Sequence, residues 1–387
     1  MTSLQAETGR QPNIGHEVIV CHQRYPHSFP HTPGRRLMFP TPDPPSPSRR
    51  VVERLLHEVW FGTSIAARAG AAMLVPLSLI TARESARRRA QIRSLPAPST
   101  PVIVVGNLVV GGAGKTPLAI AISRGLRAHG HQVGLLCSGY RGARKEARLV
   151  PPSADAGEHG DEAVLLARAG CGPVAAGRHR GEAFAVLLRE HPELTVVVSD
   201  DGLQHVHLPR TVELAVFDRR GAGNGRLLPA GPLRESLAAL AGIDAIVLNG
   251  QAVCPVPHPR VFGFHMVAER FVPLAAHHEP IAAADFASFA AQASVAALAG
   301  IGEPERFFDM LRGLGIRAQT LPLPDHAPIE RTRLDRLQAD LVLMTAKDAV
   351  KCVGFADPRC WALEVSADPD PQLISWLAEV LVGHTSA

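Results

Sequence analysis

The stretch Val102–Ile122, V-I-V-V-G-N-L-V-V-G-G-A-G-K-T-P-L-A-I-A-I, decides the fold of this 387-residue chain. A run of β-branched apolar residues leads into a glycine-rich turn, and a segment with helical apolar spacing follows. Glycines let backbone N–H groups converge on phosphate oxygens, and a helix N-terminus adds partial positive charge. The residues expected to bind the phosphates are Gly111, Gly112, Ala113, Gly114, Lys115 and Thr116.

The turn fits the phosphate-loop pattern G-x-x-x-x-G-K-[ST] except at its first glycine, where this chain has Val109. In such a loop Lys115 reaches the β- and γ-phosphates, and the Thr116 hydroxyl ligates Mg²⁺. The alternative is a glycine turn that only packs closely. The order of strand, loop, Lys-Thr and helix favours a nucleoside triphosphate site.

Composition excludes several other classes of protein. An apolar fraction of 46% is ample for a core, and a net charge of +4 gives no argument for a nucleic-acid partner. The six cysteines are scattered and form no C-x-x-C pair, which is typical of reduced thiols in a cytosolic protein. The N-terminal residues lack the pattern of a signal peptide, so we expect none, and nothing in the sequence indicates an obligate protein partner.

The N-terminal part divides in two. Residues 1–50 are polar and rich in proline and histidine, and we expect a disordered extension. Residues 51–98 predict amphipathic helices, with an uncharged stretch at Ala69–Ala82 that is too short to span a bilayer. A cluster of arginines follows, so the segment favours a helix in a membrane interface with its arginines on anionic headgroups. A packed helical hairpin with solvated arginines is the alternative.

From Pro101 onward strands alternate with helices, which predicts a parallel α/β sheet with helices on both faces. We expect a nucleotide-binding domain at 99–254, an extended linker at 255–275 and a smaller α/β domain at 276–387. Predicted strands are Val102–Val105, Gln132–Leu136, Leu194–Ser199, Val212–Phe217, Ala245–Leu248, Ser294–Leu298, Arg317–Pro322 and Leu341–Thr345. Predicted helices include Pro117–Ala128, Asp161–Ala169, Gly181–Arg189, Glu303–Gly313, Leu334–Ala339 and Pro371–Leu381.

A second chemical signal is Leu194–His205, where an apolar strand ends in Asp200 and Asp201. A carboxylate at this end of a strand, beside a phosphate loop, is where nucleotide-bound Mg²⁺ is held. The alternative is a pair of turn-forming acids. Gln204 and His205 lie just beyond and are candidates for substrate contact.

Three further motifs are ambiguous from the residues alone. H-G-D-E at 159–162 places Asp161 at a helix start, where a capping role is the simpler interpretation. The glycine- and proline-rich loop Asn224–Glu235 carries Arg226 and Arg234, which suit an anionic substrate group or a solvated surface. In L-P-D-H-A-P, His326 is a proton acceptor or an ordinary loop residue.

These features separate the classes of phosphate-loop protein. The N-K-x-D motif of a regulatory GTPase is absent, and Thr345–Asp348 reads T-A-K-D. A membrane-associated ATPase without a lipid acceptor is the alternative function. The arginine-bearing loop and the second α/β domain favour transfer of phosphate to an acceptor.

The motifs, taken together and in order, resemble the tetraacyldisaccharide 4'-kinase family, the lipid A kinases. They are V-G-N-L-V-V-G-G-A-G-K-T-P, H-G-D-E, S-D-D-G-L-Q-H, N-G-R-L-L-P-A-G-P-L-R-E, A-G-I-G-E-P-E-R-F-F, P-D-H and L-M-T-A-K-D-A-V-K. The resemblance implies a P-loop NTPase-like fold and ATP with Mg²⁺ as cofactors. It implies phosphorylation of the 4'-hydroxyl of an acylated glucosamine disaccharide 1-phosphate in lipid A and lipopolysaccharide biosynthesis. The implied location is the cytoplasmic face of the inner membrane, with peripheral attachment to its lipid surface.

The resemblance also implies roles for particular residues. Asp161 and His326 resemble a catalytic pair in which the carboxylate, supported by the imidazole, activates the sugar hydroxyl. Asp200, Asp201 and Thr116 resemble the metal and catalytic acids, with Lys115 on the phosphates. Residues expected to contact the substrate are Tyr140, Gln204, His205, Arg226 and Arg234. The chain departs from the family pattern at Ser138, Ala327 and Ala346.

Overall fold

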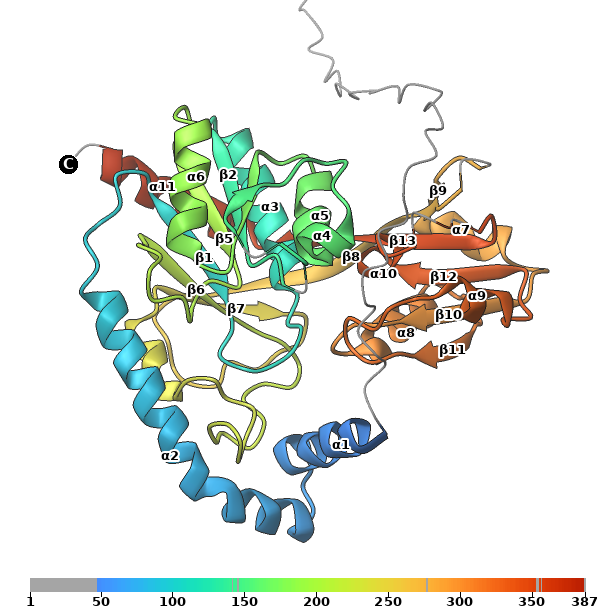
Figure 1. The fold of residues 1–387 in the computed structure, drawn as a ribbon, viewed down its shortest axis with the longest axis horizontal. Helices are drawn as coiled ribbons and strands as arrows, with labels where there is room; N and C mark the ends of the chain where they lie inside the picture. The colour runs from blue at the N-terminus through green and yellow to red at the C-terminus, as the bar shows by residue number, and fades with distance from the viewer. Residues whose placement is uncertain are drawn as a thin grey trace, which may run out of the picture. The chain divides into compact units, whose positions relative to one another are not determined.

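The computed structural model describes residues 47–385 except 141, 145, 276–277, 353–354 and 356. The extension predicted at residues 1–50 lies almost wholly outside this part of the chain, so that prediction is untested. The strands within the described ranges form one sheet in the order β11-β10-β12-β13-β8-β7-β6-β1-β5-β2-β4-β3, and β9 pairs with β8 (Figure 1). The α/β class predicted from the sequence is confirmed.

The bounds of the elements follow the alternation of apolar runs and turns. The strands are β1 Val102–Gly106, β2 Val133–Cys137, β3 Arg148–Leu149, β4 Val174–Ala176, β5 Val196–Asp200, β6 Val212–Phe217, β7 Ala245–Asn249, β8 Val261–Pro273, β9 Ile281–Ala282, β10 Val295–Ala299, β11 Gln319–Pro322, β12 Leu341–Thr345 and β13 Cys360–Pro369. The helices are α1 Pro47–Phe61, α2 Ile65–Arg93, α3 Lys115–Ala128, α4 Ala156–His159, α5 Asp161–Arg168, α6 Arg180–Glu190, α7 Ala283–Phe289, α8 Pro304–Gly313, α9 Arg331–Asp335, α10 Ala346–Ala349 and α11 Pro371–Thr385, with a 3₁₀ turn at Leu237–Gly242.

The strand β1 shows why its sequence is apolar without alternation. Ile103 and Val105 face a core with α3 and α11, whereas Val102 and Val104 face the opposite core, which includes α6. Both faces of the sheet are therefore covered by helices, as expected for parallel strands joined by crossovers. The parallel ladders β1–β5 and β1–β6 place β1 at the centre of this half of the sheet.

The long strands β8 and β13 join two groups of parallel strands. The start of β8 pairs in parallel with β7, and its remainder pairs antiparallel with β13, which in turn pairs in parallel with β12. Because of this reversal, the strands β10–β13 run opposite to β1, β2 and β4–β7. Because β8 is long, its second half lies beyond the carboxyl end of β7, and β13 and β12 pair there. The carboxyl ends of β10, β12 and β13 therefore point toward the carboxyl ends of β1, β5, β6 and β7. The functional loops meet there.

Some details of the sequence prediction need correction. The short strands β3, β4 and β9 were not predicted, and neither was β13, although it is the central connection of the sheet. The helix expected at Leu334–Ala339 is instead α9, which lies earlier at Arg331–Asp335. The proposed domain boundaries stay a prediction, since the strands on both sides of residues 255–275 belong to one continuous sheet and β8 itself lies inside that segment.

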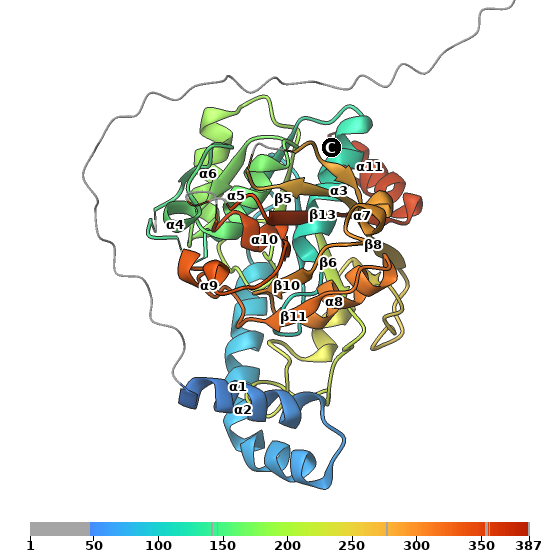
Figure 2. The same ribbon diagram turned by 90° about the vertical axis from the view of Figure 1, so that its right-hand side faces the viewer.

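The helices α1 and α2 form an arm that projects from the sheet (Figures 1 and 2). Most side chains in the first half of α2 are exposed, apart from the buried Ala67 and Ala71, whereas its second half is fixed to the body. Ser78 donates a hydrogen bond to the Leu227 carbonyl at 2.8 Å, and Arg89 forms ion pairs with Glu213 and Glu235 at 2.7 and 2.5 Å. The expectation that all the arginines face headgroups is therefore wrong for Arg89, because two buried carboxylates from distant parts of the chain bind it.

Candidate active site

The phosphate loop follows the end of β1 and leads directly into α3. Gly114 is the N-cap of α3 with φ of 88°, and a Cβ atom there would lie 2.6 Å from the Asn249 amide nitrogen. Only glycine fits this position without a shift. A Cβ atom on Gly112 would meet no atom within 4 Å. The loop therefore has a tightly packed side against β7 and an open side where an anion can approach the backbone.

Arg220, which the sequence analysis did not identify, binds the backbone of the phosphate loop. Its guanidinium donates to the carbonyls of Val110 and Gly112 at 3.3 and 3.1 Å and pairs with buried Asp218 at 2.8 Å. Arg306 from α8 also contacts Asp218 at 3.4 Å. With carbonyl oxygens of the loop bound to Arg220, fewer of them face an incoming phosphate. In the sequence, the only sign of Arg220 is the D-R-R-G string at 218–221, which precedes the loop Asn224–Glu235.

Lys115 begins α3 and lies beside the acidic pair. Its ammonium group donates to the Asn107 side chain at 3.2 Å and lies 3.6 Å from a carboxylate oxygen of Asp201. Asp201 has a left-handed backbone conformation with φ of 51°, which is rare for a residue other than glycine. Burial alone would raise the pKa of Asp201, but the charges of Lys115 and Arg234 lower it to about 2. Asp201 is thus an ionised carboxylate.

Asp200 has the opposite electrostatics although it is the adjacent residue. It is buried at the end of β5, and burial together with the nearby Glu162 charge raises its pKa to about 7. Thr116 donates a hydrogen bond to one of its carboxylate oxygens at 2.6 Å, and the other oxygen has no hydrogen-bond partner. A buried carboxylate oxygen without a partner beside a phosphate loop fits a cation ligand. A Mg²⁺ ion would be held by Asp200 and Thr116, since hard oxygen donors are what it prefers.

Asp161 and His326 meet although 165 residues separate them in the sequence. The His326 Nδ1 atom lies 2.9 and 3.2 Å from the two carboxylate oxygens of Asp161. Lys347 lies 3.1 Å from the other ring nitrogen, Nε2. Because an ammonium group can only donate, it fixes Nε2 as the acceptor and Nδ1–H as the donor to Asp161. The capping interpretation of Asp161 is therefore incomplete, and His326 is more than a loop residue.

The environment keeps Asp161 ionised. Burial raises its pKa, but the hydrogen bond with His326 and the charge of Lys347 outweigh burial and hold the pKa below its usual value. Lys351 adds a cation 3.9 Å away. His326 has φ of 58°, a left-handed conformation that a histidine adopts only when its surroundings hold it there. The arrangement presents a charged, oriented carboxylate between the two groups of strands.

The predicted substrate residues divide between this centre and the surface. Tyr140 packs edge-on against the His326 ring at 5.3 Å. Arg234 lies 3.4 Å from Asp201 and 3.3 Å from the Gln204 side chain, which in turn donates to Glu235 at 2.7 Å. The structure brings these residues together. Arg226 is exposed, and among the described residues its side chain has no ion pair.

His205 lies near the acidic pair in a different setting. Burial and the charge of Arg180 lower its pKa to about 3, so its ring is neutral at physiological pH. Arg180 is itself buried and donates to the backbone carbonyl of Asp200 at 3.1 Å. Sequence reasoning missed Arg180, Lys347 and Lys351. The two lysines lie in the quoted string L-M-T-A-K-D-A-V-K, but their pairing with Asp161 and His326 depends on the sheet order.

The departures from the family pattern lie beside these groups. The Ser138 hydroxyl accepts from the Tyr140 N–H at 3.0 Å, and Lys351 donates to the Ala327 carbonyl at 3.3 Å. Ala346 begins α10, whose second residue is Lys347. Each of the three departures therefore lies within two residues of Tyr140, His326 or Lys347.

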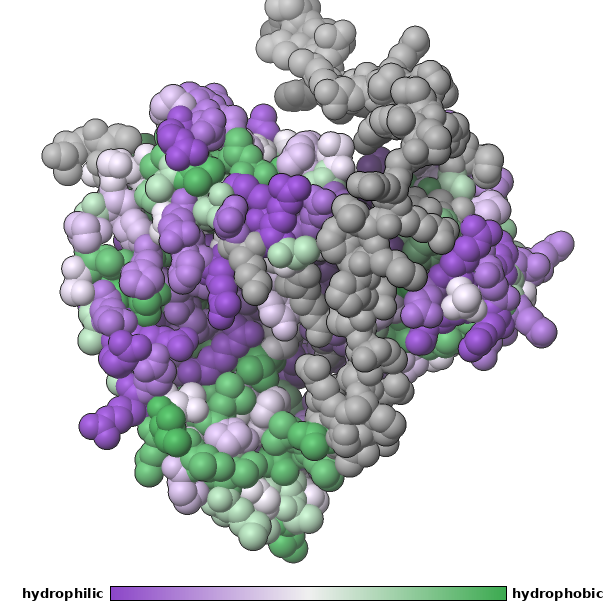
Figure 3. Space-filling view, viewed as in Figure 1, coloured by the Kyte–Doolittle hydropathy of each residue, from purple (hydrophilic) through white to green (hydrophobic). Residues whose placement is uncertain are grey.

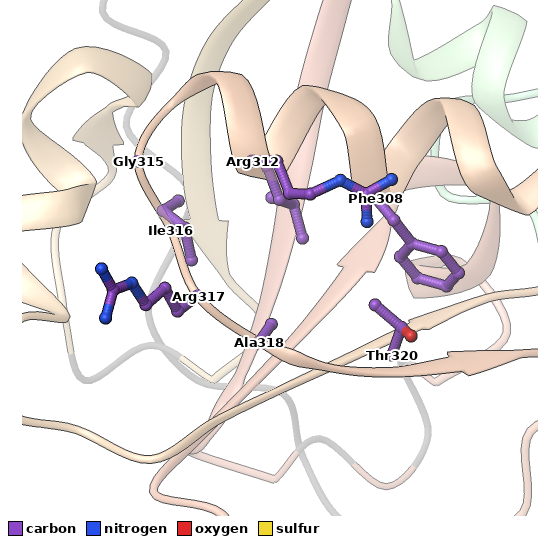
Figure 4. A pocket seen from close by; sticks show the side chains of 8 residues that line it. Phe308, Arg312, Gly315, Ile316, Arg317, Ala318 and Thr320 are labelled. Atoms are coloured by element: carbon purple, nitrogen blue, oxygen red, sulfur yellow. The ribbon is translucent and has the colours of Figure 1, made fainter.

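The described residues also form two pockets, and one of them is lined in part by two of the predicted site residues. One of about 440 Å³ lies between α8 and β11 and is lined by Phe308, Leu311, Arg312, Gly315, Ile316, Arg317, Ala318 and Thr320 (Figure 4). It contains none of the predicted site residues. The other, of about 270 Å³, is lined in part by Gln204 and His205 and reaches α2. In the described part of the chain, no group of three or more His, Cys, Asp or Glu side chains has the geometry of a metal site.

Comparison with known proteins gives the family. The family model described as tetraacyldisaccharide-1-P 4'-kinase matches residues 70–382. The chain belongs to the tetraacyldisaccharide 4'-kinase family. It is 44% identical to the tetraacyldisaccharide 4'-kinase of Bordetella petrii, over 83% of this chain and 92% of that protein. It is also 44% identical to that of Dechloromonas aromatica, over 81% of this chain and 94% of the relative.

A solved structure of the tetraacyldisaccharide 4'-kinase family agrees. The crystal structure of LpxK from Aquifex aeolicus in complex with ATP matches with a TM-score of 0.66 and 26% identity. The match covers 81% of this chain and 99% of that protein. The predicted P-loop NTPase-like fold is thereby confirmed, with the sheet of a kinase of this family.

Proposed function

We propose that this protein transfers the γ-phosphate of ATP to the 4'-hydroxyl of a tetraacylated glucosamine disaccharide 1-phosphate. The observation that carries the proposal is the Asp161–His326–Lys347 arrangement, placed across from a phosphate loop with its own acidic pair. A binding protein for a nucleotide alone would need the loop but not a second oriented carboxylate. Membership of the tetraacyldisaccharide 4'-kinase family supports the same acceptor.

The donor half of the site holds the triphosphate. The N–H groups of the phosphate loop and the N-terminus of α3 face the phosphates, and Lys115 neutralises charge on the β- and γ-phosphates. Asp200 and Thr116 would hold a Mg²⁺ ion, which would supply further charge neutralisation there. Asp201 keeps Lys115 and Arg234 in place near the phosphoryl group. These contacts stabilise charge that develops during transfer.

The acceptor half orients the sugar hydroxyl. Asp161 accepts the hydroxyl proton in a hydrogen bond, and the Nδ1–H of His326 keeps its carboxylate turned to the acceptor. A carboxylate with a low pKa is a weak base, so the proton moves late, as the new O–P bond forms. That suits phosphoryl transfer, where positioning and charge stabilisation dominate. Lys347 holds the tautomer of His326 throughout.

We propose that the arm of α1 and α2 binds the lipid surface at the cytoplasmic face of the inner membrane. Exposed apolar side chains gather on this arm (Figure 3). They are Val52, Leu55, Ile65, Met73, Val75, Leu77, Leu79 and Ile80, and Ile65 and Met73 are 87% and 82% exposed. Within the described residues, α2 is the one helix that by length and composition is apolar enough to cross a membrane.

Anchoring of α2 to the body favours an interfacial position over a spanning one. Ser78 already contacts the loop at Leu227, so about 13 residues of α2 are free of the body, or about 20 Å at 1.5 Å per residue. The hydrocarbon core of a bilayer is about 30 Å thick. The free part of α2 is thus shorter than a membrane span, and an interfacial helix fits its length.

Incubation with labelled ATP and the tetraacylated disaccharide 1-phosphate tests the proposal. We expect labelled lipid product from the wild type and a loss of about 10²–10⁴-fold with Asp161→Asn. Asp285→Asn, an exposed acid on α7, is the matched control and should retain full activity. ATP hydrolysis without lipid product in the wild type would favour the alternative ATPase and refute the kinase proposal.

Membrane attachment needs a separate test, since removing α2 would also remove Arg89 and Ser78 from the body. Substituting Ile65, Met73 and Ile80 by serine removes apolar surface without a cost to the core. We expect at least about tenfold weaker binding to phospholipid vesicles. Val253→Ser, at an apolar residue 78% exposed outside the arm, is the control. Unchanged vesicle binding of the triple variant would refute the attachment.

A further inference from the structure

The loop that follows β10 lies against the phosphate loop. It spans Gly300–Glu303, reads G-I-G-E, and leads directly into α8. A Cβ atom on Gly302 would lie 3.1 Å from the Gly112 nitrogen and 3.6 Å from a carboxylate oxygen of Asp325. Gly302 is therefore close both to the glycines of the phosphate loop and to the residue before His326. The first turn of α8 is thus placed where the donor and acceptor halves of the site meet.

Arg306 lies in this first turn, and its guanidinium contacts the phosphate loop. Its Nη1 atom donates to the Gly112 carbonyl at 3.4 Å and lies 3.4 Å from a carboxylate oxygen of Asp218. Gly112 is the residue whose open side lets an anion approach the loop. The Arg306 side chain is only 24% exposed. Its charge is therefore held at the junction of the two halves and not spread into solvent.

Arg306 is less completely paired than its neighbour Arg220. The Nε and Nη2 atoms of Arg220 bind the Asp218 carboxylate at 3.0 and 2.8 Å. Among the described residues, both hydrogen bonds of Arg306 use Nη1 at 3.4 Å, and the Glu303 carboxylate lies 3.8 Å from its Nε. Burial outweighs the charges of Asp218 and Glu303 and lowers the pKa of Arg306, although a guanidinium stays protonated. The fold thus keeps a part-buried cation with long contacts beside the phosphate loop.

Phosphoryl transfer requires positive charge at this place. The acceptor oxygen forms a bond to the γ-phosphorus, and the bond from that phosphorus to the β–γ bridging oxygen breaks. ADP leaves with that electron pair, and the hydroxyl proton goes to Asp161. Negative charge is shared by the transferred and leaving oxygens, and in other phosphate-loop enzymes an arginine from another segment stabilises it. Lys115 belongs to the loop itself, whereas Arg306 comes from the facing group of strands.

We propose that Arg306 donates to the oxygens of the transferring phosphoryl group and stabilises the charge that develops there. The proposal rests on the proposed function and adds a catalytic residue from the second group of strands. Little rearrangement is needed, because Asp218 keeps Arg220 when Arg306 exchanges its 3.4 Å contacts for the phosphoryl oxygens. The planar fork of arginine donates paired hydrogen bonds to a phosphoryl group, which a lysine ammonium does not. The close approach at Gly302 fits this role, since a side chain there would push α8 away from Gly112.

The test measures nucleotide binding and catalysis separately in three variants. Arg306→Ala removes the guanidinium, Arg306→Lys keeps the charge without the fork, and Arg312→Ala is the control on the same helix. Arg312 is 57% exposed and lines the pocket between α8 and β11 (Figure 4). Asp218 retains Arg220 in both Arg306 variants, so we expect them to fold. Urea unfolding checks this, and Arg306→Lys carries the test if the alanine variant does not fold.

We expect a loss of catalysis with little loss of ATP binding. Arg306→Ala should lower kcat with the tetraacylated disaccharide 1-phosphate at least about 100-fold, while the Kd for ATP in calorimetry changes less than about threefold. Binding of ADP with aluminium fluoride, which mimics the transferring group, should weaken far more than binding of ADP alone. Free guanidinium ion should restore part of the kcat of this variant. Arg306→Lys should stay at least about tenfold below the wild type, and Arg312→Ala should equal it.

Three outcomes separate this proposal from the others. An unchanged kcat in Arg306→Ala overturns it while leaving the kinase function intact. Equal losses of affinity for ATP, for ADP and for ADP with aluminium fluoride also overturn it, because Arg306 would then only hold the phosphate loop in shape. Absence of transfer by the wild type refutes the proposed function itself.

Discussion

Replacing Asp200 by asparagine is expected to abolish phosphoryl transfer and yet stabilise the folded protein at alkaline pH. The reason is that the fold buries this carboxylate beside Glu162 and leaves one of its oxygens without a partner. Its pKa rises from 3.8 to about 7, so the folded protein holds a proton that the unfolded chain releases. The stabilisation from that proton is fully present below about pH 4 and is lost as the pH rises through about 7.

The magnitude follows from the two pKa values. Between pH 5 and pH 8 the ionisation of Asp200 should cost the wild type about 2.5 kcal/mol of folding free energy, whereas asparagine has no charge to lose. Other acids titrate equally in both proteins and cancel in the difference. A constant penalty of about 1–3 kcal/mol for the buried amide is also independent of pH. The free energy of unfolding of the variant minus that of the wild type should therefore be about 2.5 kcal/mol larger at pH 8 than at pH 5.

Urea unfolding followed by far-UV circular dichroism, without Mg²⁺ and with a chelator, measures this difference. Asp201→Asn is the matched control at the next position. The pKa of Asp201 is held at about 2 by Lys115 and Arg234 against its burial, so it is ionised at both pH values. Its variant should be less stable than the wild type by the same amount at pH 5 and pH 8. A stability difference for Asp200→Asn that does not change with pH would refute the reasoning.

Three further outcomes follow from the contacts. Arg89→Met should lower the free energy of unfolding in urea by about 3 kcal/mol, because it leaves Glu235 buried without a cation. The control Arg83→Met, at an exposed position, should change it by less than about 0.5 kcal/mol, and equal effects of the two variants would contradict the buried pairing. Lys347→Met should shift the acidic limb of the pH–rate profile to higher pH, since the cation lowers the pKa of Asp161, and an unmoved limb would exclude that role. Arg220→Met should weaken nucleotide binding about tenfold in calorimetry with the acceptor KM unchanged, and normal affinity would show that the loop holds its shape without it.

The sequence predicts well what is local in the chain. The phosphate loop needs only a strand, its glycines and a helix start in order, and Thr116 and Asp200 then meet because both follow parallel strands that end at the same edge. The carboxyl ends of β1 and β5 are neighbours in the sheet, and this adjacency explains the 2.6 Å hydrogen bond between Thr116 and Asp200. Most strand bounds agree within one or two residues for the same reason.

What was missed depends on pairing between distant segments. The strand β13 has a polar second half, and its place beside β8 is fixed only when the sheet is complete. Lys347 reaches His326 because β11 and β12 flank β10, an order that no local pattern encodes. Arg89 lies in a run of arginines that reads as solvated, and the partners that bury it are 124 and 146 residues away.

The C-terminal helix α11 has a consequence for biosynthesis. Leu373, Ile374 and Leu377 complete the core that β1 and α3 share, and Ile374 packs directly on Gly125. The nucleotide half therefore cannot close its core until α11 leaves the ribosome, although the strands of that half are made much earlier. During translation the apolar face of α3 stays exposed while the more than two hundred residues between α3 and α11 are made. Chaperones are expected to bind this exposed face. Short C-terminal truncations should consequently appear in cells as aggregated protein, with the loss beginning where α11 leaves α3 uncovered.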